Sequence, residues 1–283
     1  MTFENYIEDF IDLAFKEDIG DGDHTSLSTI PDSAKGKAQL LVKQEGILAG
    51  SNVAELIFKK LDPSISLKYF IPDGHKIVVG DIAFEAEGKV LALLQAERLV
   101  LNIMQRMSGI ATQTNIYVKK LKGLNTKVLD TRKTTPGMRL LDKMAVKLGG
   151  GENHRIGLFD MILIKDNHID FAGGIENAIK RAKNYLTEKN KELKIEIEAR
   201  SIDDVQTILK IGGIHRIMLD NFTIKETSEA VSLINGKYET ESSGGITLEN
   251  LRDYAECGVD YISVGALTHQ IKSLDLSLKA VDF

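Results

Sequence analysis

The chain has a single cysteine, no long apolar run and no excess of positive charge. Because Cys257 is the only cysteine in the 283 residues, an internal disulfide and a cysteine metal cluster are both excluded. No apolar run approaches the roughly 20 residues that a membrane-spanning helix needs. The formal net charge of −5 argues against wholesale binding of nucleic acid or an anionic membrane. The N-terminal segment MTFENYIEDFIDLAF has acids and no basic part, so we expect no signal peptide and a cytoplasmic protein.

Several catalytic signatures are also missing. No GxGxxG motif follows an expected strand, which disfavours a dinucleotide-binding, doubly wound sheet. The sequence offers no Ser-His-Asp or Cys-His arrangement for nucleophilic catalysis. His154, His168, Glu198 and Asp220 lack the tight spacing of zinc ligands and lie beside cations, so we expect no metal held by fixed protein ligands.

The first part of the chain reads as a mixed α/β domain. Apolar residues at helical spacing predict a helix over 4–17, which ends in the polar segment EDIGDGDHTS, interpreted as a solvated loop that holds His24. Short strands with turn residues between them are predicted over 37–90, interrupted by a helix at 51–60. A long helix follows over 95–121. We expect an α/β sandwich-like domain here.

From residue 127 onward, short apolar strands alternate with helices. The expected strands are KVLD, MILIK, IEIEA, RIMLD, YETES and DYISVG. Alternation at this spacing predicts parallel strands joined by helical crossovers. About six such units favour a barrel related to the eightfold one but smaller, with an open doubly wound sheet as the alternative. We place the first domain at residues 1–112, the barrel at 113–269, and the tail 270–283 with the first domain.

Charged or small residues lie at the end of every one of these strands or directly after it. In chain order they are Thr131, Arg132 and Lys133; Lys165, Asp166, Asn167 and His168; Glu198; Asp220 and Asn221; Ser242, Ser243, Gly244 and Gly245; Val264, Gly265 and Ala266. The carboxyl ends of strands in a parallel α/β barrel converge on one face, and that face carries the site. The pattern therefore predicts one functional site built from six strand ends.

The residue types indicate the ligand. Arg132, Lys133, Arg155 and Lys165 are too many cations to leave unpaired in a cleft, so they predict a ligand with carboxylates, phosphates or both. The carboxylates of Glu198 and Asp220 suit sugar hydroxyls or a hydrated Mg²⁺. The loops at 243–245 and 265–266 can bring backbone N–H groups close to a phosphate. His154 could hydrogen-bond a ligand carboxylate or be structural, and Arg98 and Asn102 could simply face solvent.

Long motifs in this chain resemble those of the quinolinate phosphoribosyltransferase family (nicotinate-nucleotide pyrophosphorylase, carboxylating). They are EDIGDGDHTS, AERLVLNIMQRMSGIAT, DTRKTTPG, GGGENHRIGLFDMILIKDNHI, LDNF, SGGITLENLRDYAECGVDYISVGALTH and LDLSLK. The resemblance implies transfer of phosphoribose from 5-phosphoribosyl-1-pyrophosphate to quinolinate with Mg²⁺ present, giving nicotinate mononucleotide, CO₂ and pyrophosphate. It also implies a sandwich domain with a barrel of about six strands, and a homodimer or larger assembly in which Arg98 reaches the neighbour's site.

Carried over to this sequence, the resemblance assigns catalytic roles to Lys133, Lys165, Glu198 and Asp220. The substrate-binding set that it implies is Arg98, Thr131, Arg132, Lys133, His154, Arg155, Lys165, Glu198, Asp220, Ser243, Gly244, Gly245, Val264, Gly265 and Ala266. Arg200 is an extra cation that could lie on the rim of the site or have no role. Two alternatives stay open: a phosphoribosyltransferase for a monocarboxylate such as nicotinate, and a non-catalytic protein that binds a phosphorylated sugar.

Overall fold

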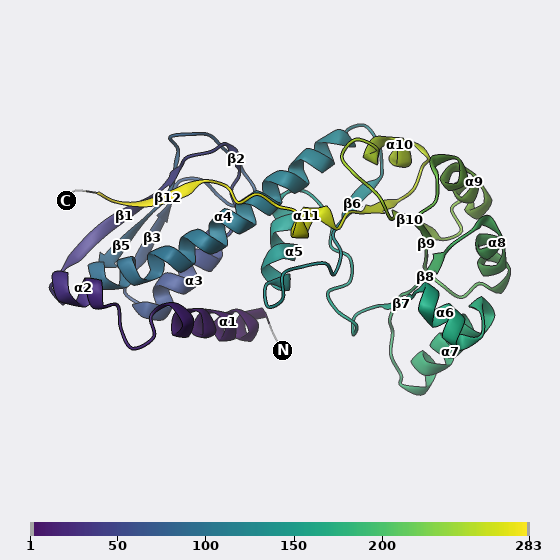
Figure 1. Cartoon of the computed structure of the whole chain (residues 1–283), viewed down its shortest axis with the longest axis horizontal. Helices are drawn as coiled ribbons and strands as arrows, with labels where there is room; N and C mark the ends of the chain where they lie inside the picture. The colour runs from purple at the N-terminus through teal and green to yellow at the C-terminus, as the bar shows by residue number, and fades with distance from the viewer. Residues whose placement is uncertain (1–2, 282–283) are drawn as a thin grey trace. The chain divides into compact units, whose positions relative to one another are not determined.

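The computed structural model describes residues 3–281, and the chain forms two compact units. The first unit contains the chain up to Asn115, the segment Thr135–Gly150, and the chain from Gln270 onward. The second unit contains Ile116–Thr134 and Gly151–His269. The chain therefore passes between the units more than once (Figure 1).

The first unit is built on an antiparallel sheet with the strand order β12-β1-β5-β3. Its strands are β1 (Lys35–Val42), β3 (Ser66–Tyr69), β5 (Ile82–Lys89) and β12 (Leu276–Val281), and β2 (Gly46–Ile47) pairs with β4 (Lys76–Ile77). Alternate residues of β1 are buried, among them Ala38, Leu40 and Val42, as expected for a strand with one face on the core. Phe58 and Phe84 meet edge to face in that core, with ring centroids 6.3 Å apart.

Five helices lie wholly or partly in the first unit. They are α1 (Phe3–Asp18), α2 (His24–Thr29), α3 (Ser51–Leu61), α4 (Val90–Lys120, which runs on into the second unit) and α5 (Arg139–Leu148). The expectation of a loop around His24 is wrong, because α2 begins there. The Asp23 side chain accepts a hydrogen bond from the Ser26 N–H at 3.1 Å and caps this short helix. The long helix begins at Val90, five residues before the predicted start at residue 95.

Helix α5 packs within the first unit, although the sequence-based division placed it in the barrel. The Arg106 guanidinium on α4 holds the fully buried Asp142 carboxylate through two hydrogen bonds of 2.8 Å. At the end of α5, Gly149 lies so close to Ala111 and Thr114 that a Cβ would overlap them. Helix α5 therefore packs against α4 in the core of the first unit, because it shares a buried ion pair with α4 and its end approaches the α4 backbone closely.

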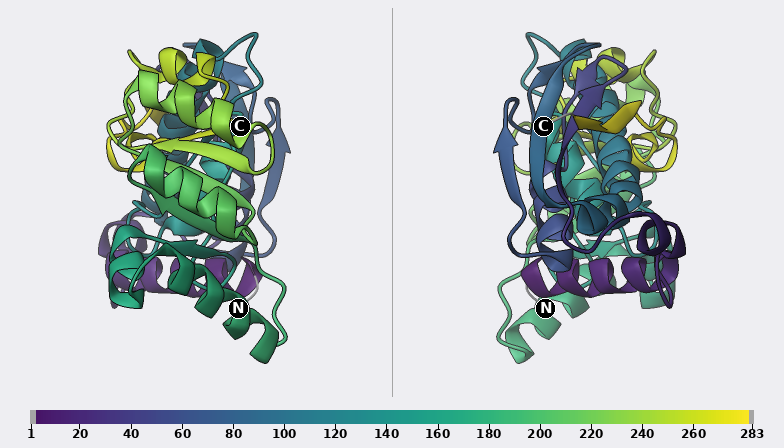
Figure 2. Two further views of the ribbon diagram at one scale, coloured as in Figure 1. Left: turned by 90° about the vertical axis from the view of Figure 1, so that its right-hand side faces the viewer. Right: turned by 90° about the vertical axis from the view of Figure 1, so that its left-hand side faces the viewer.

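The second unit is built on a six-stranded parallel sheet with the order β6-β11-β10-β9-β8-β7. The strands are β6 (Lys127–Leu129), β7 (Ile162–Ile164), β8 (Ile195–Ala199), β9 (Arg216–Asp220), β10 (Glu239–Ser243) and β11 (Tyr261–Ser263). The helices between them are α6 (Asp166–Ala172), α7 (Ile175–Glu188), α8 (Ile202–Ile211), α9 (Ile224–Ile234), α10 (Leu251–Glu256) and α11 (Ala266–His269). Helices α7, α8 and α9 follow one another along the outside of the sheet (Figure 2).

The predicted α/β fold with a six-stranded parallel barrel domain is confirmed by this sheet. In the described residues β6 and β7 are its two outer strands, and Leu129 of β6 makes an isolated parallel bridge with Glu152 of the following segment. Segment 151–155 therefore extends the sheet beyond β6 on the side that faces away from β11.

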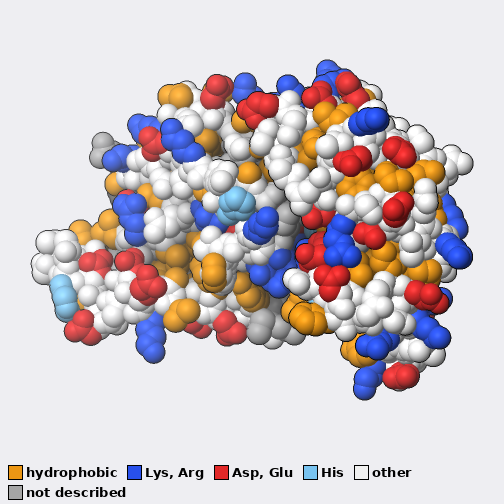
Figure 3. Space-filling view, turned by 45° about the vertical axis from the view of Figure 1, so that its right-hand side comes forward, with side chains coloured by type: hydrophobic (Ala, Val, Ile, Leu, Met, Phe, Trp, Pro, Cys, Tyr) orange, Lys and Arg blue, Asp and Glu red, His pale blue; other side chains and the backbone are white. Residues whose placement is uncertain are grey.

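The mixture of charged and apolar side chains on the surface is the one expected from the composition of the sequence. On the face shown in Figure 3, acidic and basic side chains are interspersed with each other and with apolar ones. Among residues 3–281, no helix combines the length and the apolar character that a membrane crossing requires.

Candidate active site

Strand geometry decides which side chains of the second unit share one face of its sheet. Because successive residues of a strand point to opposite faces, Glu196 and Glu198 lie on one face of β8, and Arg216 and Asp220 on one face of β9. Glu196 is the register partner of Arg216, so the faces of the two strands coincide. The face therefore has an inner layer with Glu196 and Arg216, and an outer layer at the carboxyl ends with Glu198 and Asp220.

The outer layer contains a cation and a backbone donor that both contact the Glu198 carboxylate, with the Asp220 carboxylate nearby. The Lys165 ammonium, directly after β7, pairs with Oε1 of Glu198. The Asp166 N–H at the start of α6 donates to Oε2 of the same carboxylate at 3.1 Å. Burial raises the pKa of Asp220, and the neighbouring charge of Glu198 raises it further. The structure thus brings together Lys165, Glu198 and Asp220, as the strand ends predicted.

Asn221 connects Asp220 to the glycine loop after β10. Its side chain donates to Oδ2 of Asp220 at 2.8 Å, and its N–H donates to the Ser243 carbonyl at 2.8 Å. Gly244 has a φ of +89°, and a Cβ there would overlap the Asn221 side chain. Gly245 also has a positive φ, of +62°, but faces open space. Position 244 therefore needs glycine for both conformation and space, and an approach of this loop to a phosphate stays a prediction.

Lys133 lies against the loop after β11. A Cβ on Gly265 would come within 3.0 Å of Cδ of Lys133, so the aliphatic part of Lys133 runs over this glycine. The Thr268 hydroxyl in α11 donates to the Lys133 carbonyl at 2.9 Å, and the Lys133 N–H donates to Oγ1 of Thr131 at 3.0 Å. Thr131 is thus a turn-stabilising neighbour of Lys133 in this structure. The exposed ammonium of Lys133 is held over the second glycine loop.

Arg155 is a further cation, in the segment between α5 and β7. Its guanidinium is half-buried and donates to the Met161 carbonyl at 3.2 Å. Burial lowers the pKa of Arg155, and the nearby Arg132 lowers it further, so two cations lie close together. Two like charges in a partly buried place are stabilised by an anion, which is the property predicted for this site.

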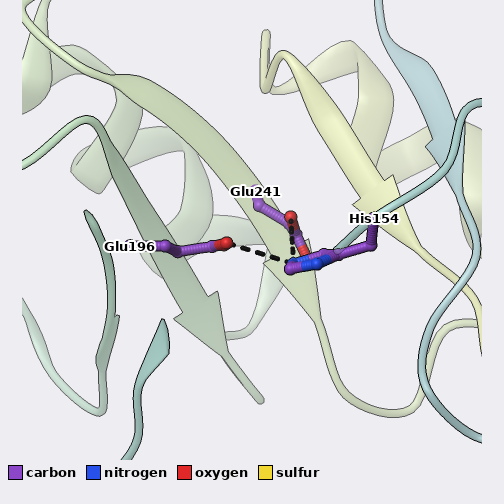
Figure 4. Close-up of side chains that lie close together, drawn as sticks. All are labelled: His154, Glu196 and Glu241. Atoms are coloured by element: carbon purple, nitrogen blue, oxygen red, sulfur yellow. Dashed lines mark ion pairs between the residues drawn. The ribbon is translucent and has the colours of Figure 1, made fainter. Parts of the chain in front are cut away.

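His154 is buried in the inner layer, where the sequence-based analysis expected either a ligand contact or a structural role. Its Nε2 lies 3.0 Å from Oε2 of Glu196 and 3.5 Å from Oε2 of Glu241. Figure 4 shows both carboxylates, from β8 and β10, directed at the ring. The backbone N–H of His154 donates to Oδ1 of the fully buried Asp130 at 2.9 Å. Direct contact of His154 with a substrate stays a prediction.

Arg216 is the cation at the centre of this buried cluster. Its guanidinium lies 2.9 Å from Oε2 of Glu241, 3.2 Å from Oε2 of Glu239 and 3.9 Å from Oε2 of Glu196. The guanidinium also stacks 4.1 Å from the centroid of the Tyr261 ring. Burial lowers the pKa of Arg216, but these three carboxylates raise it more, so the group stays charged.

Burial raises the pKa of Glu196 to about 7 and that of Glu241 to about 8, against opposing attraction by Arg216. The sequence-based analysis did not identify this cluster. The sequence does contain an indication of this cluster. Acids recur at every second position in IEIEA and YETES, although both segments are expected to be buried strands.

His154, Glu196 and Glu241 bring three possible ligand atoms within 4.8 Å of one another, so they were tested as a metal site. The Arg155 N–H donates to Nδ1 of His154 at 2.7 Å, which uses the lone pair of that nitrogen. In a neutral imidazole the proton is then on Nε2, the only ring atom that faces the carboxylates. A ring in this state cannot ligate a metal there, and Arg216 already supplies the positive charge. These residues fit a proton-sharing cluster and not a cation site.

The remaining candidates have simpler positions. Arg98 lies on α4 in the first unit, with an exposed side chain. The Val264 N–H donates to the Leu129 carbonyl as part of the sheet, and Ala266 is the first residue of α11. Arg200 pairs with Asp170 at 3.0 Å and with Asp204 at 3.6 Å, so acids near the start of α8 and on α6 neutralise this extra cation.

Comparisons with known proteins cover both units. Residues 23–108 match the family model "Quinolinate phosphoribosyl transferase, N-terminal domain", and residues 110–279 match "Quinolinate phosphoribosyl transferase, C-terminal domain". The chain is 45% identical over 284 residues to quinolinate phosphoribosyltransferase (decarboxylating) 1b of Nicotiana tabacum, covering 95% of this chain and 81% of that protein. It is 42% identical over 264 residues to a probable nicotinate-nucleotide pyrophosphorylase (carboxylating) of Bacillus subtilis, covering 93% of this chain and 90% of that protein.

Solved structures agree with the sequence matches. The crystal structure of NadC from Streptococcus pyogenes superposes with a TM-score of 0.92 at 36% identity, covering 100% of this chain and 99% of that one. The nicotinate-nucleotide pyrophosphorylase from Francisella tularensis superposes with a TM-score of 0.92 at 38% identity, covering 99% and 98% of the two chains. Human nicotinic acid phosphoribosyltransferase, at 11% identity and a TM-score of 0.61, shares the fold. With matches along both units, the chain belongs to the quinolinate phosphoribosyltransferase family.

Proposed function

We propose that this protein transfers the phosphoribosyl group of 5-phosphoribosyl-1-pyrophosphate to quinolinate and releases CO₂ and pyrophosphate, giving nicotinate mononucleotide for NAD biosynthesis. The observation that carries the proposal is the meeting of cations, carboxylates and glycine loops at one end of the parallel sheet. Lys165 contacts Glu198, Asn221 joins Asp220 to Gly244, and Lys133 lies over Gly265.

The two substrates have charges that match this division of the site. Quinolinate carries two carboxylates, which suit the cations Arg132, Arg155 and Lys165. The 5-phosphate suits the backbone N–H groups around Ser243, Gly244 and Gly245 and the turn at 264–266. The ribose hydroxyls suit the acceptors Glu198 and Asp220. Lys133, at the border of the two groups, is positioned for the departing pyrophosphate.

The reaction needs orientation and charge stabilisation and no protein nucleophile. Pyrophosphate leaves C1 of the sugar, and the pyridine nitrogen of quinolinate attacks the carbon that becomes positive. The ring nitrogen is then cationic, and the electron pair of the bond to the adjacent carboxylate can remain on the ring as CO₂ leaves. Side chains that hold both carboxylates keep the ring in place through these steps.

Mg²⁺ is proposed as a companion of the pyrophosphate, where it would neutralise charge on the leaving group. Glu198 is already engaged by Lys165 and by the Asp166 N–H, and Asp220 by Asn221. This donor set fits a hydrated Mg²⁺ that is held by substrate and water near the two carboxylates, with no fixed protein ligands.

We also propose a homodimer, or a larger assembly of such dimers, in which the exposed Arg98 serves the neighbouring subunit's site. A cytoplasmic location is proposed from the composition, although related plant proteins have names that place them in chloroplasts or mitochondria. Size measurement in solution and cell fractionation test these two points.

The decisive assay supplies purified protein with the pyrophosphate sugar, Mg²⁺ and either quinolinate or nicotinate, and follows CO₂ and pyrophosphate. Equal release of both products with quinolinate, and little reaction with nicotinate, is expected. Preference for nicotinate would favour the monocarboxylate enzyme. Binding of the sugar without turnover of either acid would favour a non-catalytic binding protein.

A further inference from the structure

Two fully buried carboxylates, Glu196 and Glu241, take no part in the proposed reaction, yet both face the ring of His154. Figure 4 shows that the ring comes from the segment after α5, whereas the carboxylates come from strands of the sheet. A buried charge is retained only where it is paired. The question is what this pairing does for the segment that carries the ring.

The hydrogen bonds define the state of the ring. The Arg155 N–H points at Nδ1 from 2.7 Å, so Nδ1 has to present its lone pair. Nε2 then carries the proton and lies 3.0 Å from Oε2 of Glu196, close enough for attraction although the two atoms are not in hydrogen-bond geometry. If the proton moved to Nδ1, two donors would face each other and the contact with Arg155 would be lost. A carboxylate that contacts one ring nitrogen commonly fixes the tautomer in this way.

The ring in turn fixes the backbone at two consecutive residues. The backbone N–H of His154 donates to the buried carboxylate of Asp130 at 2.9 Å, and the backbone N–H of Arg155 donates to Nδ1 of the ring. These two bonds set the direction in which the Arg155 side chain leaves the chain. That direction has to be imposed, because the guanidinium is half-buried and lies near a second cation, Arg132.

We propose that Glu196 is a positioning residue, which holds His154 with its proton on Nε2 and thereby places Arg155 for the carboxylates of the pyridine substrate. The inference rests on the proposed function for the identity of that substrate. Glu239 offers a matched comparison, because it is an acid of the same cluster that instead reaches Arg216 at 3.2 Å and Lys194 at 3.5 Å.

The experiment compares Glu196→Gln with Glu239→Gln in the full-length protein. Steady-state kinetics are measured with quinolinate and the pyrophosphate sugar varied in turn. For Glu196→Gln we expect the KM for quinolinate to rise about tenfold, because the charge that faces Nε2 of His154 from 3.0 Å is lost. Its kcat and its KM for the sugar should stay within about twofold of the wild type, as should every parameter of Glu239→Gln.

The state of the ring is measured independently by ¹⁵N NMR of labelled histidine, with a His154→Asn sample to assign the signal. We expect Nε2 protonation in all three proteins, because the Arg155 N–H still faces Nδ1, and a changed Nε2 chemical shift in Glu196→Gln alone, because the charge 3.0 Å from Nε2 is removed. An unchanged Nε2 signal, or an equal loss in all kinetic parameters, would overturn the inference. If Glu196→Gln does not fold, Glu196→Asp is used, for which a smaller rise in the KM for quinolinate and a retained Nε2 proton are expected.

The two readouts separate this inference from the proposed function. A wild-type protein that does not turn over quinolinate refutes the proposed function. An Nε2 signal that is unchanged in Glu196→Gln refutes the positioning role, whatever the substrate, because the NMR measurement needs none.

Discussion

Replacement of Gly244 by alanine tests the geometry of the glycine loop. Gly244 has a φ of +89°, where an alanine costs about 1–2 kcal/mol. The added Cβ also overlaps the Asn221 side chain, which has to move and give up its 2.8 Å hydrogen bond to Asp220. That bond contributes about 0.5–1.5 kcal/mol, so the free energy of unfolding should fall by roughly 1.5–3.5 kcal/mol in total. Urea unfolding measures this difference.

Gly245 provides the control for this substitution. Its φ of +62° imposes a similar backbone cost on alanine, but a Cβ there meets nothing within 4 Å. We expect Gly245→Ala to lower the free energy of unfolding by only about 1–2 kcal/mol. The difference between the two variants isolates the contact with Asn221.

A double-mutant cycle completes the test. Asn221 has a φ of +57°, so Asn221→Gly removes the side chain without adding backbone strain. In that background Gly244→Ala should cost little more than Gly245→Ala, although the Asn221 backbone N remains 3.0 Å from the new Cβ. If Gly244→Ala costs the same in both backgrounds, or no more than Gly245→Ala, the reasoning about this loop is wrong.

Three further outcomes follow from the structure and the proposed function. Lys133→Ala should lower turnover by orders of magnitude while its thermal unfolding curve stays near that of the wild type, and near-normal CO₂ release would contradict its role. Inactive Arg98→Ala and Lys165→Ala proteins should regain partial activity when mixed, and no recovery despite demonstrated subunit exchange would count against a shared site. Burial raises the pKa of Glu241 to about 8, so the folded state binds more protons than the unfolded state below that pH, and stability should fall as pH rises from about 5 to 8. Glu241→Gln imitates the protonated acid and should flatten this fall in urea unfolding, and an unchanged slope would refute the explanation.

The strands of the second unit could be predicted because the pattern that defines each strand lies within a few consecutive residues. Each is a short buried run bounded by polar residues, so the expected segments IEIEA and RIMLD coincide with β8 and β9. The contact between Lys165 and Glu198 could also be expected, since both lie at the carboxyl ends of neighbouring parallel strands. The pairing of Asn221 with Gly244 required a left-handed backbone that the sequence LDNF does not reveal by itself.

Other features depended on contacts between distant segments. Helix α5 lies between two strands of the sheet in sequence, so the alternation pattern assigned it to the barrel, and only the buried pair Arg106–Asp142 shows its place. Glu196 of β8 and Glu241 of β10 were treated as ordinary strand residues. Their partner His154 is more than forty residues before Glu196 in the chain, and no spacing rule connects them.

The pairing of β12 with β1 has a consequence for how the protein is made. Strand β1 has β5 on one side and β12 on the other, and β12 follows the whole parallel sheet in the sequence. While the ribosome synthesises the second unit, the backbone donors and acceptors on that side of β1 have no strand partner. Unpaired edges of this kind promote association with other chains. The nascent protein therefore has an interval of vulnerability that closes only after residues 276–281 emerge, and mutations that slow the second unit's folding could act through aggregation of the first.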